Sequence, residues 1–264
     1  MTGEFLGHLQ ALLHEVQETQ REAFAAAADR IAGTLQAGGL VQLFGSGHSV
    51  IPVMDAFPRY GSFVGFNPLM DPRLMWSSVL GPGGVRELLW LERTEGYIER
   101  FLSHEPISPG DTLIVFSHGG RNAAPVEAAM YGRDHGATVI AVTSKQNLSR
   151  PAEHSTGKRL AEVAEIVIDT RVPVQDALVD VDGWPAPVAG ASTIVACACV
   201  GELISLVAGR LAAKGVTLPT FVSPTVPGAS VQSNDHVFAA HAAAMREAAQ
   251  RSSLPPAGTA NPEK

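Results

Sequence analysis

Two short segments of the chain place serine and glycine directly after an apolar run. The first is Phe44-Gly-Ser-Gly-His-Ser49, and the second is Phe116-Ser-His-Gly-Gly-Arg-Asn122. Glycines let a backbone approach a ligand closely, and the N–H groups at the start of a helix attract an anion. Serine hydroxyls add further donors. The pattern therefore predicts two turns that could hold a phosphate group.

The first turn differs from two well-known phosphate-binding loops. A dinucleotide-binding fingerprint requires a third glycine, but position 50 is Val. A P-loop requires a lysine before its Ser or Thr, and this turn has none. A glycine-rich connection can also be no more than a tight turn. Either turn alone is weak support for a ligand site, so their relative position matters.

The elements around the turns alternate between apolar strands and amphipathic helices. We expect strands at 40–44, 62–66, 112–116, 138–143 and 165–169, and helices at 4–35, 50–60, 84–104, 123–135, 190–214 and 239–251. Such alternation is typical of a parallel sheet covered on both faces. We predict an α/β fold with a flavodoxin-like five-stranded parallel sheet of order 2-1-3-4-5. Strands 1 and 3 are adjacent in this order, so both turns would face one crevice.

The domain organisation is expected to be simple. We predict a single domain over residues 1–250, with an N-terminal helix within 1–37 and a helical excursion at 67–105. The tail at 252–264 contains three prolines and is predicted to be disordered.

Composition excludes several classes of protein. The 264 residues carry a net charge of −7 without a basic block, which argues against nucleic-acid binding. No signal peptide is visible, and the apolar run at 188–200 is too short to span a bilayer, so we expect a cytoplasmic protein without a membrane segment. Cys197 and Cys199 have no nearby partner for a metal site. We expect neither a metal nor a cofactor.

Further motifs make the chain resemble a known family. With the two turns, they are Asn67-Pro68, Asp71-Pro72, Ser155-Thr-Gly-Lys-Arg159 and Gly190-Ala-Ser-Thr193. From about residue 4 to residue 240 the chain resembles the sugar isomerase (SIS) domain, and most closely the stand-alone bacterial SIS proteins. The resemblance implies a phosphosugar ligand and a homodimer or larger assembly.

The resemblance also implies which residues bind the phosphosugar, through hydroxyls and backbone amides. They are Gly45, Ser46, Gly47, Ser49, Ser117, Gly119, Gly120, Asn122, Ser192 and Thr193. Two departures from the family pattern stand out. His118 and Gly119 replace Asn and Ser, which removes one hydroxyl donor, and Met54 and Asp55 stand where relatives carry paired Glu.

SIS enzymes share one step, the removal of the proton beside the sugar carbonyl. This step needs a carboxylate or a histidine near its working pH. The candidates are Asp55, His48 and Glu202. Glu202 is the only charge between Asp182 and Arg210, and a buried unpaired charge is costly unless it is used. A salt bridge or a solvent-facing position would instead give Glu202 a structural role.

Other polar residues have open roles. His154, Lys158 and Arg159 lie on a polar loop that could close over an anion or simply face solvent. His236 and His241 lie near the last helix, from which SIS relatives sometimes supply a histidine across the dimer.

The predicted function follows from this resemblance. We expect a lyase that dehydrates N-acetylglucosamine 6-phosphate or a similar amino-sugar 6-phosphate by eliminating the 3-hydroxyl. The first alternative is a phosphosugar aldose–ketose isomerase. The second is a non-catalytic phosphosugar sensor, which is less favoured because the chain has no helix-turn-helix module.

Overall fold

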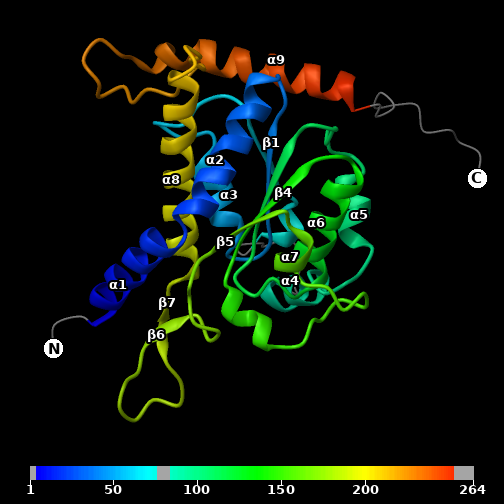
Figure 1. The fold of residues 1–264 in the computed structure, drawn as a ribbon, viewed down its shortest axis with the longest axis vertical. Coiled ribbons are helices and arrows are strands. Elements are labelled where there is room, and N and C mark those ends of the chain that lie inside the picture. Colours follow the sequence, from blue (N-terminus) through cyan, green and yellow to red (C-terminus); the bar gives the residue numbers. More distant parts are fainter. Residues whose placement is uncertain (1–3, 76–83, 253–264) are drawn as a thin grey trace, which may run out of the picture.

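A five-stranded parallel sheet organises the protein (Figure 1). The computed structural model describes residues 4–75 and 84–252. The strands are β1 (Val41–Gly45), β2 (Phe66–Leu69), β3 (Thr112–Phe116), β4 (Thr138–Thr143) and β5 (Ile166–Asp169). Their order is β2-β1-β3-β4-β5, which confirms the predicted topology.

Helices cover both faces of the sheet, as Figure 1 shows. One face packs against α1 (Glu4–Thr19), α2 (Arg21–Gln36), α3 (Val50–Ala56), α8 (Ser192–Ala212) and α9 (Asp235–Arg251). The other packs against α4 (Gly84–Leu91), α5 (Tyr97–Leu102), α6 (Ala123–Asp134) and α7 (Leu160–Val163). Along β3, Ile114 belongs to the first core and Leu113 to the second. Every residue of β3 is buried, because alternate side chains serve opposite faces.

Short elements complete the chain. In residues 4–75 and 84–252, 3-10 helices lie at Pro72–Leu74 (η1), Lys145–Ser149 (η2) and Val231–Asn234 (η3). An antiparallel hairpin, β6 (Ala177–Val179) and β7 (Val188–Gly190), lies between β5 and α8. This hairpin is not predicted from the sequence, because its strands are short and flank a loop rich in Pro and Asp.

The expected single N-terminal helix is wrong, because the helix breaks at Gln20. The buried Gln20 amide reaches the end of β5, where its Oε1 accepts from the Asp169 backbone N–H at 3.0 Å. Its Nε2 donates to the Thr19 hydroxyl at 3.0 Å. A side chain that satisfies a strand end in this way fixes α1 and α2 as two helices.

Other expected boundaries also move. The second strand lies at 66–69 rather than 62–66, and it contains Pro68, which an edge strand tolerates because one of its sides needs no N–H donor. The helix expected at 84–104 is split by Gly96, whose φ is +82°. The helix expected at 50–60 ends at Ala56, and the last helix begins at Asp235 rather than 239. The tail expected to be disordered lies outside the described residues, apart from Ser252.

One expectation about membranes needs correction. Because the helix continues past the run at 188–200 to Ala212, α8 is long and apolar enough to cross a membrane by length and composition alone. A core helix of a folded domain passes the same test, and α8 packs on α2 and α3.

Candidate functional site

The two serine- and glycine-containing turns lie side by side at the carboxyl end of the sheet. Gly45 at the end of β1 pairs with Phe116 at the end of β3. A Cβ on Gly45 would collide with the backbone carbonyl of Ser49, so only glycine lets α3 begin this close to the strand. Gly120 has φ +59°, and a Cβ there would come within 2.9 Å of the Thr143 hydroxyl. Both turns therefore depend on a glycine for their shape.

A small cavity lies between the two turns and the start of α8. Its polar lining consists of Ser49, Ser117, His118, Thr170, Ser192 and Thr193. The cavity volume is about 10 Å³, which is room for about one water molecule. Four predicted phosphate-binding residues thus surround one cavity, although their role in binding stays a prediction.

Two buried atoms in this cavity lining lack a hydrogen-bond partner within the described part of the chain. They are the Thr170 hydroxyl and Nδ1 of His118. Buried polar groups are nearly always paired, so an unpaired hydroxyl such as that of Thr170 beside a cavity suits a ligand. Because Nε2 of His118 faces the Val174 carbonyl and donates to it, Nδ1 is an acceptor in the neutral ring. The sequence analysis did not propose Thr170, because it follows β5 without any glycine or serine pattern. It noted His118 only as a departure from the family.

A buried carboxylate, Glu92, connects the two turns. It follows α4 and is 8% exposed. Its Oε2 accepts from the Ser46 hydroxyl at 3.1 Å, and its Oε1 accepts from Asn122 Nδ2 at 2.9 Å. Arg93 also donates to Oε1, at 2.9 Å. One carboxylate therefore receives bonds from the first turn, the second turn and its own neighbour.

Burial raises the pKa of Glu92, while the charge of Arg93 and the Ser46 hydrogen bond partly oppose this rise. A buried carboxylate with a raised pKa is a candidate general base. Glu92 contacts both turns but does not itself line the cavity between them. The sequence analysis missed Glu92, which has no motif and lies far along the chain from both turns.

The structure does not bring Asp55, Glu202 and His48 into the cavity lining. Asp55 of α3 pairs with Arg59, three residues beyond the end of that helix, and both line a groove beside α8. Glu202 is exposed, which agrees with the solvent-facing alternative and not with a buried charge. It lies ten residues beyond Ser192, about 15 Å along α8. His48 is in the first turn and exposed.

The polar loop at 144–160 makes contacts within the protein. His154 is buried, with Nε2 3.6 Å from Glu127 and 3.9 Å from Glu95. Arg159 binds Glu162 at 2.8 Å and the Arg150 carbonyl. Lys158 is exposed. Lys158 therefore fits the solvent-facing alternative, whereas the buried His154 does not, and Arg159 is engaged in contacts within the chain.

The two histidines near the C-terminus differ in environment. His236 is exposed, whereas the His241 ring packs 4.8 Å from that of Phe57. Burial lowers the pKa of His241, so it is neutral over more of the pH range than a free histidine. Among the described residues, no group of three or more His, Cys, Asp or Glu could hold a metal ion.

Comparison with known proteins identifies several similar chains. The SIS domain pattern matches residues 4–144. A UPF0309 protein of Halalkalibacterium halodurans is 33% identical over 230 residues, which are 87% of this chain and 90% of the relative. A UPF0309 protein of Streptomyces coelicolor is 35% identical over 227 residues, or 86% of this chain and 89% of the relative.

Two solved structures share the fold. The phosphoheptose isomerase GmhA from Neisseria gonorrhoeae has a TM-score of 0.53 at 14% identity, and covers 77% of this chain and 95% of its own. A phosphoheptose isomerase from Francisella tularensis has a TM-score of 0.51 at 15% identity, with 77% and 94% covered. Together with the sequence relatives, these findings confirm the resemblance expected from the motifs.

Proposed function

Because the chain belongs to the SIS domain family, we propose that it is an enzyme of sugar phosphates in which Glu92 is the general base. The observation behind this proposal is that one buried carboxylate accepts hydrogen bonds from Ser46 of the first turn and Asn122 of the second. A ligand held by both turns would therefore contact residues that are hydrogen-bonded to this carboxylate.

The phosphate group is assigned to the cavity between the turns and α8. Hydroxyls of Ser49, Ser117, Thr170 and Ser192 surround it, and the start of the 21-residue helix α8 adds backbone N–H donors. The raised pKa of Glu92 makes this carboxylate a stronger proton acceptor than an exposed glutamate. Proton removal beside a sugar carbonyl is the step that suits such a base.

The reaction that we favour is dehydration of N-acetylglucosamine 6-phosphate or a similar amino-sugar 6-phosphate. Glu92 removes the C2 proton of the open-chain aldehyde, the electron pair forms a double bond between C2 and C3, and the C3–O bond breaks. The departing hydroxyl takes up a proton and leaves as water. His48, in the first turn, is the candidate donor of that proton. Because C2 of this substrate carries an acetylated nitrogen and no hydroxyl, isomerisation cannot form a ketone at C2. Elimination of the 3-hydroxyl does not need a hydroxyl on C2.

The second candidate is a phosphosugar aldose–ketose isomerase. It is favoured by the two fold relatives, which are named phosphoheptose isomerases. This reaction begins with the same proton removal, so it uses the same base. It differs in returning a proton to the neighbouring carbon instead of expelling the 3-hydroxyl.

A cytoplasmic homodimer completes the proposal. Ile194 on α8 is 44% exposed and Ile51 on α3 is 42% exposed, although both belong to helices that pack on the sheet. Apolar side chains of this size on neighbouring helices suit contact with a second copy of the chain.

Proton NMR in deuterated water tests the function directly. The protein is incubated with N-acetylglucosamine 6-phosphate, and the sugar signals are followed. Loss of the C2 proton with a new vinyl signal supports dehydration. A second incubation with glucose 6-phosphate, which has a hydroxyl at C2, tests the isomerase, and deuterium incorporation with a ketose product supports it. Line broadening of either sugar phosphate without any exchange supports a sensor.

The matched variant for this experiment is Glu92→Gln. Glutamine keeps an oxygen for Asn122 and Arg93, and its amide group can donate to the Ser46 hydroxyl. The variant should therefore fold and bind the sugar phosphate without turning it over. Unchanged turnover would exclude Glu92 as the base.

A further inference from the structure

The N-terminus of α8 is occupied by a carboxylate from another part of the chain. Oδ1 of Asp176 accepts from the backbone N–H of Ala191 at 3.0 Å and of Ser192 at 2.7 Å. Its Oδ2 accepts from the Ser192 hydroxyl at 3.0 Å. These donors, at the positive end of a helix dipole, are the kind that hold a phosphate group. Asp176 therefore stands where an anionic ligand would be expected.

The cavity beside this carboxylate has donors but little room. Ser192 lines the cavity, yet its hydroxyl and its N–H are both committed to Asp176. Thr170, which is 3% exposed, and His118 each bring an unpartnered polar atom to the same lining. A volume of about 10 Å³ holds about one water molecule and not a phosphate group. A phosphate ester needs this region to open.

The backbone around Asp176 is strained. In residues 4–75 and 84–252, the non-glycine residues with positive φ are Arg171 (60°), Asp176 (67°) and Ala189 (64°). All three lie between β5 and α8: Arg171 and Asp176 precede β6, and Ala189 is the middle residue of β7. Such conformations persist where the surroundings impose them, and they gather in segments that change conformation. A Cβ on Gly190 would lie 2.9 Å from Oδ2 of Asp176, so this carboxylate position also requires glycine there.

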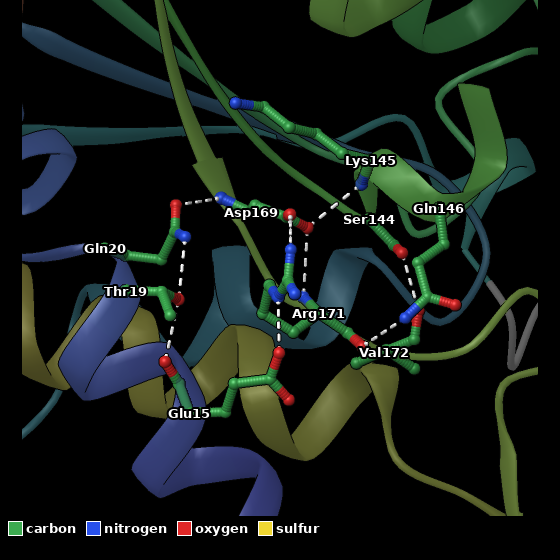
Figure 2. Close-up of polar contacts among 9 residues, drawn as sticks. All are labelled: Glu15, Thr19, Gln20, Ser144, Lys145, Gln146, Asp169, Arg171 and Val172. Carbon is green, nitrogen blue, oxygen red and sulfur yellow. Dashed lines mark hydrogen bonds and ion pairs between the residues drawn. The ribbon is translucent and has the colours of Figure 1, made fainter.

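The start of this segment is anchored, as Figure 2 shows. The Arg171 guanidinium binds Glu15 of α1 at 2.7 Å and Asp169 at 3.2 Å. Ser144 donates to the Val172 carbonyl at 2.5 Å, and Gln146 donates to the Arg171 carbonyl at 3.0 Å. These bonds fix residues 169–172 on the carboxyl ends of β4 and β5.

Beyond Val172 the chain is held by histidine side chains and by the Asp176 carboxylate instead of contacts at the ends of β4 and β5. Nε2 of His118, itself in the second turn, lies 3.2 Å from the Val174 carbonyl, and Nδ1 of His8 lies 2.8 Å from the Leu178 carbonyl. Asp176 is attached through its carboxylate, as described above, and through its backbone carbonyl, which accepts from the Ala191 N–H at 3.2 Å. The attachments through His118 and Asp176 involve residues that border the cavity or bind its lining.

We infer that residues 173–190 form a strap that closes the phosphate site, and that the Asp176 carboxylate competes with the phosphate group of the ligand for the start of α8. Binding of a phosphate ester displaces Asp176, frees the N–H and hydroxyl of Ser192, and opens the strap. This inference rests on the proposed function only in taking the ligand to be a sugar phosphate.

Calorimetric titration of wild type, Asp176→Ala and Asp180→Ala, with inorganic phosphate and with N-acetylglucosamine 6-phosphate, tests the competition. Asp180 is exposed on the same hairpin and provides the same change of charge. Removal of the competitor should tighten Kd for both probes by about tenfold or more, because the binding-competent state is no longer a minor one. Asp180→Ala should leave both values unchanged. Equal tightening in the two variants would indicate a general charge effect and overturn the competition.

A second variant and a second measurement guard against misfolding. Asp176→Asn keeps an acceptor for the two backbone N–H groups but loses the charge, so it should bind phosphate between wild type and Asp176→Ala. Hydrogen exchange of residues 173–190 should speed up when wild type binds the sugar phosphate. If wild type binds the sugar phosphate while exchange in the strap is unchanged and the Asp176 variants bind no more tightly, the strap is excluded but the proposed function stands. If no form binds either probe, both are overturned.

Discussion

Two buried carboxylates lie at opposite ends of the sheet and have different kinds of partner. Asp111, just before β3, is 1% exposed and accepts from the backbone N–H groups of Leu40 at 2.9 Å and Ser108 at 3.2 Å. The Gln42 side chain also donates to it, at 3.0 Å. Glu92, at the carboxyl end, accepts from three side chains, and two of these come from the glycine-containing turns.

The kind of hydrogen-bond donor distinguishes a structural carboxylate, Asp111, from a candidate catalytic one, Glu92. Backbone donors in a sheet and its connections are fixed by the fold, so Asp111 cannot exchange its partners without unfolding that edge. The side-chain donors around Glu92 can rotate toward a ligand. Burial also raises the pKa of Glu92, which prepares it to accept a proton. The two carboxylates are similarly buried but have different roles. Asp111 holds backbone groups in place, whereas Glu92 is the proposed proton acceptor.

The largest expected effect is the loss of turnover in Glu92→Gln. Removing a general base typically lowers the rate by about 10² to 10⁴. The substitution preserves the shape of the side chain, so Kd for N-acetylglucosamine 6-phosphate should change little. NMR rates and calorimetry on the same preparation measure both. A parallel loss of binding and turnover would mean that Glu92 anchors the turns, as Asp111 anchors the opposite end.

Asp111→Asn should lower the stability of the protein and leave its turnover nearly unchanged. An amide group would face the N–H donors that Asp111 now satisfies, which costs about 2 to 3 kcal/mol of unfolding free energy. Urea denaturation measures this loss. Turnover per folded molecule should stay near that of wild type, because Asp111 precedes the amino end of β3 and the two turns follow the carboxyl ends of β1 and β3. A stable but inactive Asp111→Asn protein would remove the distinction between the two carboxylates.

Glu92→Gln should also raise the melting temperature at neutral pH. A glutamate with a raised pKa binds its proton more tightly when folded than when unfolded. Wild type therefore loses stability as pH rises from the pKa of an unfolded glutamate through the raised pKa in the folded protein. Glutamine has no such proton, so the advantage of the variant should appear at about pH 8 and vanish at about pH 4. A gain of the same size at both values would point to packing instead of charge.

The contrast between the carboxylates also explains what the sequence could predict. The two turns are contiguous in sequence and follow apolar strands such as Thr112–Phe116, so pattern alone predicts both their nature and their proximity. Glu92 is 46 positions from Ser46 and 30 from Asn122. Its position depends on how the excursion after β2 folds, and in sequence it is one of 26 acidic residues.

Local boundaries failed where tertiary contacts decide them. Nothing in the amphipathic pattern around Gln20 signals a break, because the partner of its amide is Asp169 on a distant strand. Glu202 drew attention because its helix is apolar, yet α8 presents that position to solvent. Apolar composition predicted a core helix but not which side of the helix the core covers.

The smallest expected effect concerns two adjacent glycines of the second turn. At Gly119 a Cβ would meet nothing within 4 Å, so there is room for a serine side chain. Gly119→Ser should therefore fold normally and, by adding one hydroxyl donor, tighten sugar phosphate binding by about threefold.

Gly120→Ala is the matched contrast. Its positive φ and the Thr143 hydroxyl, 2.9 Å from the position of a Cβ, oppose a side chain, so this variant should lose stability. Calorimetry and thermal melting of both variants give the comparison. If Gly119→Ser binds no more tightly than wild type, position 119 is not directed at the ligand, and the phosphate grip in this turn depends on backbone N–H groups and Ser117.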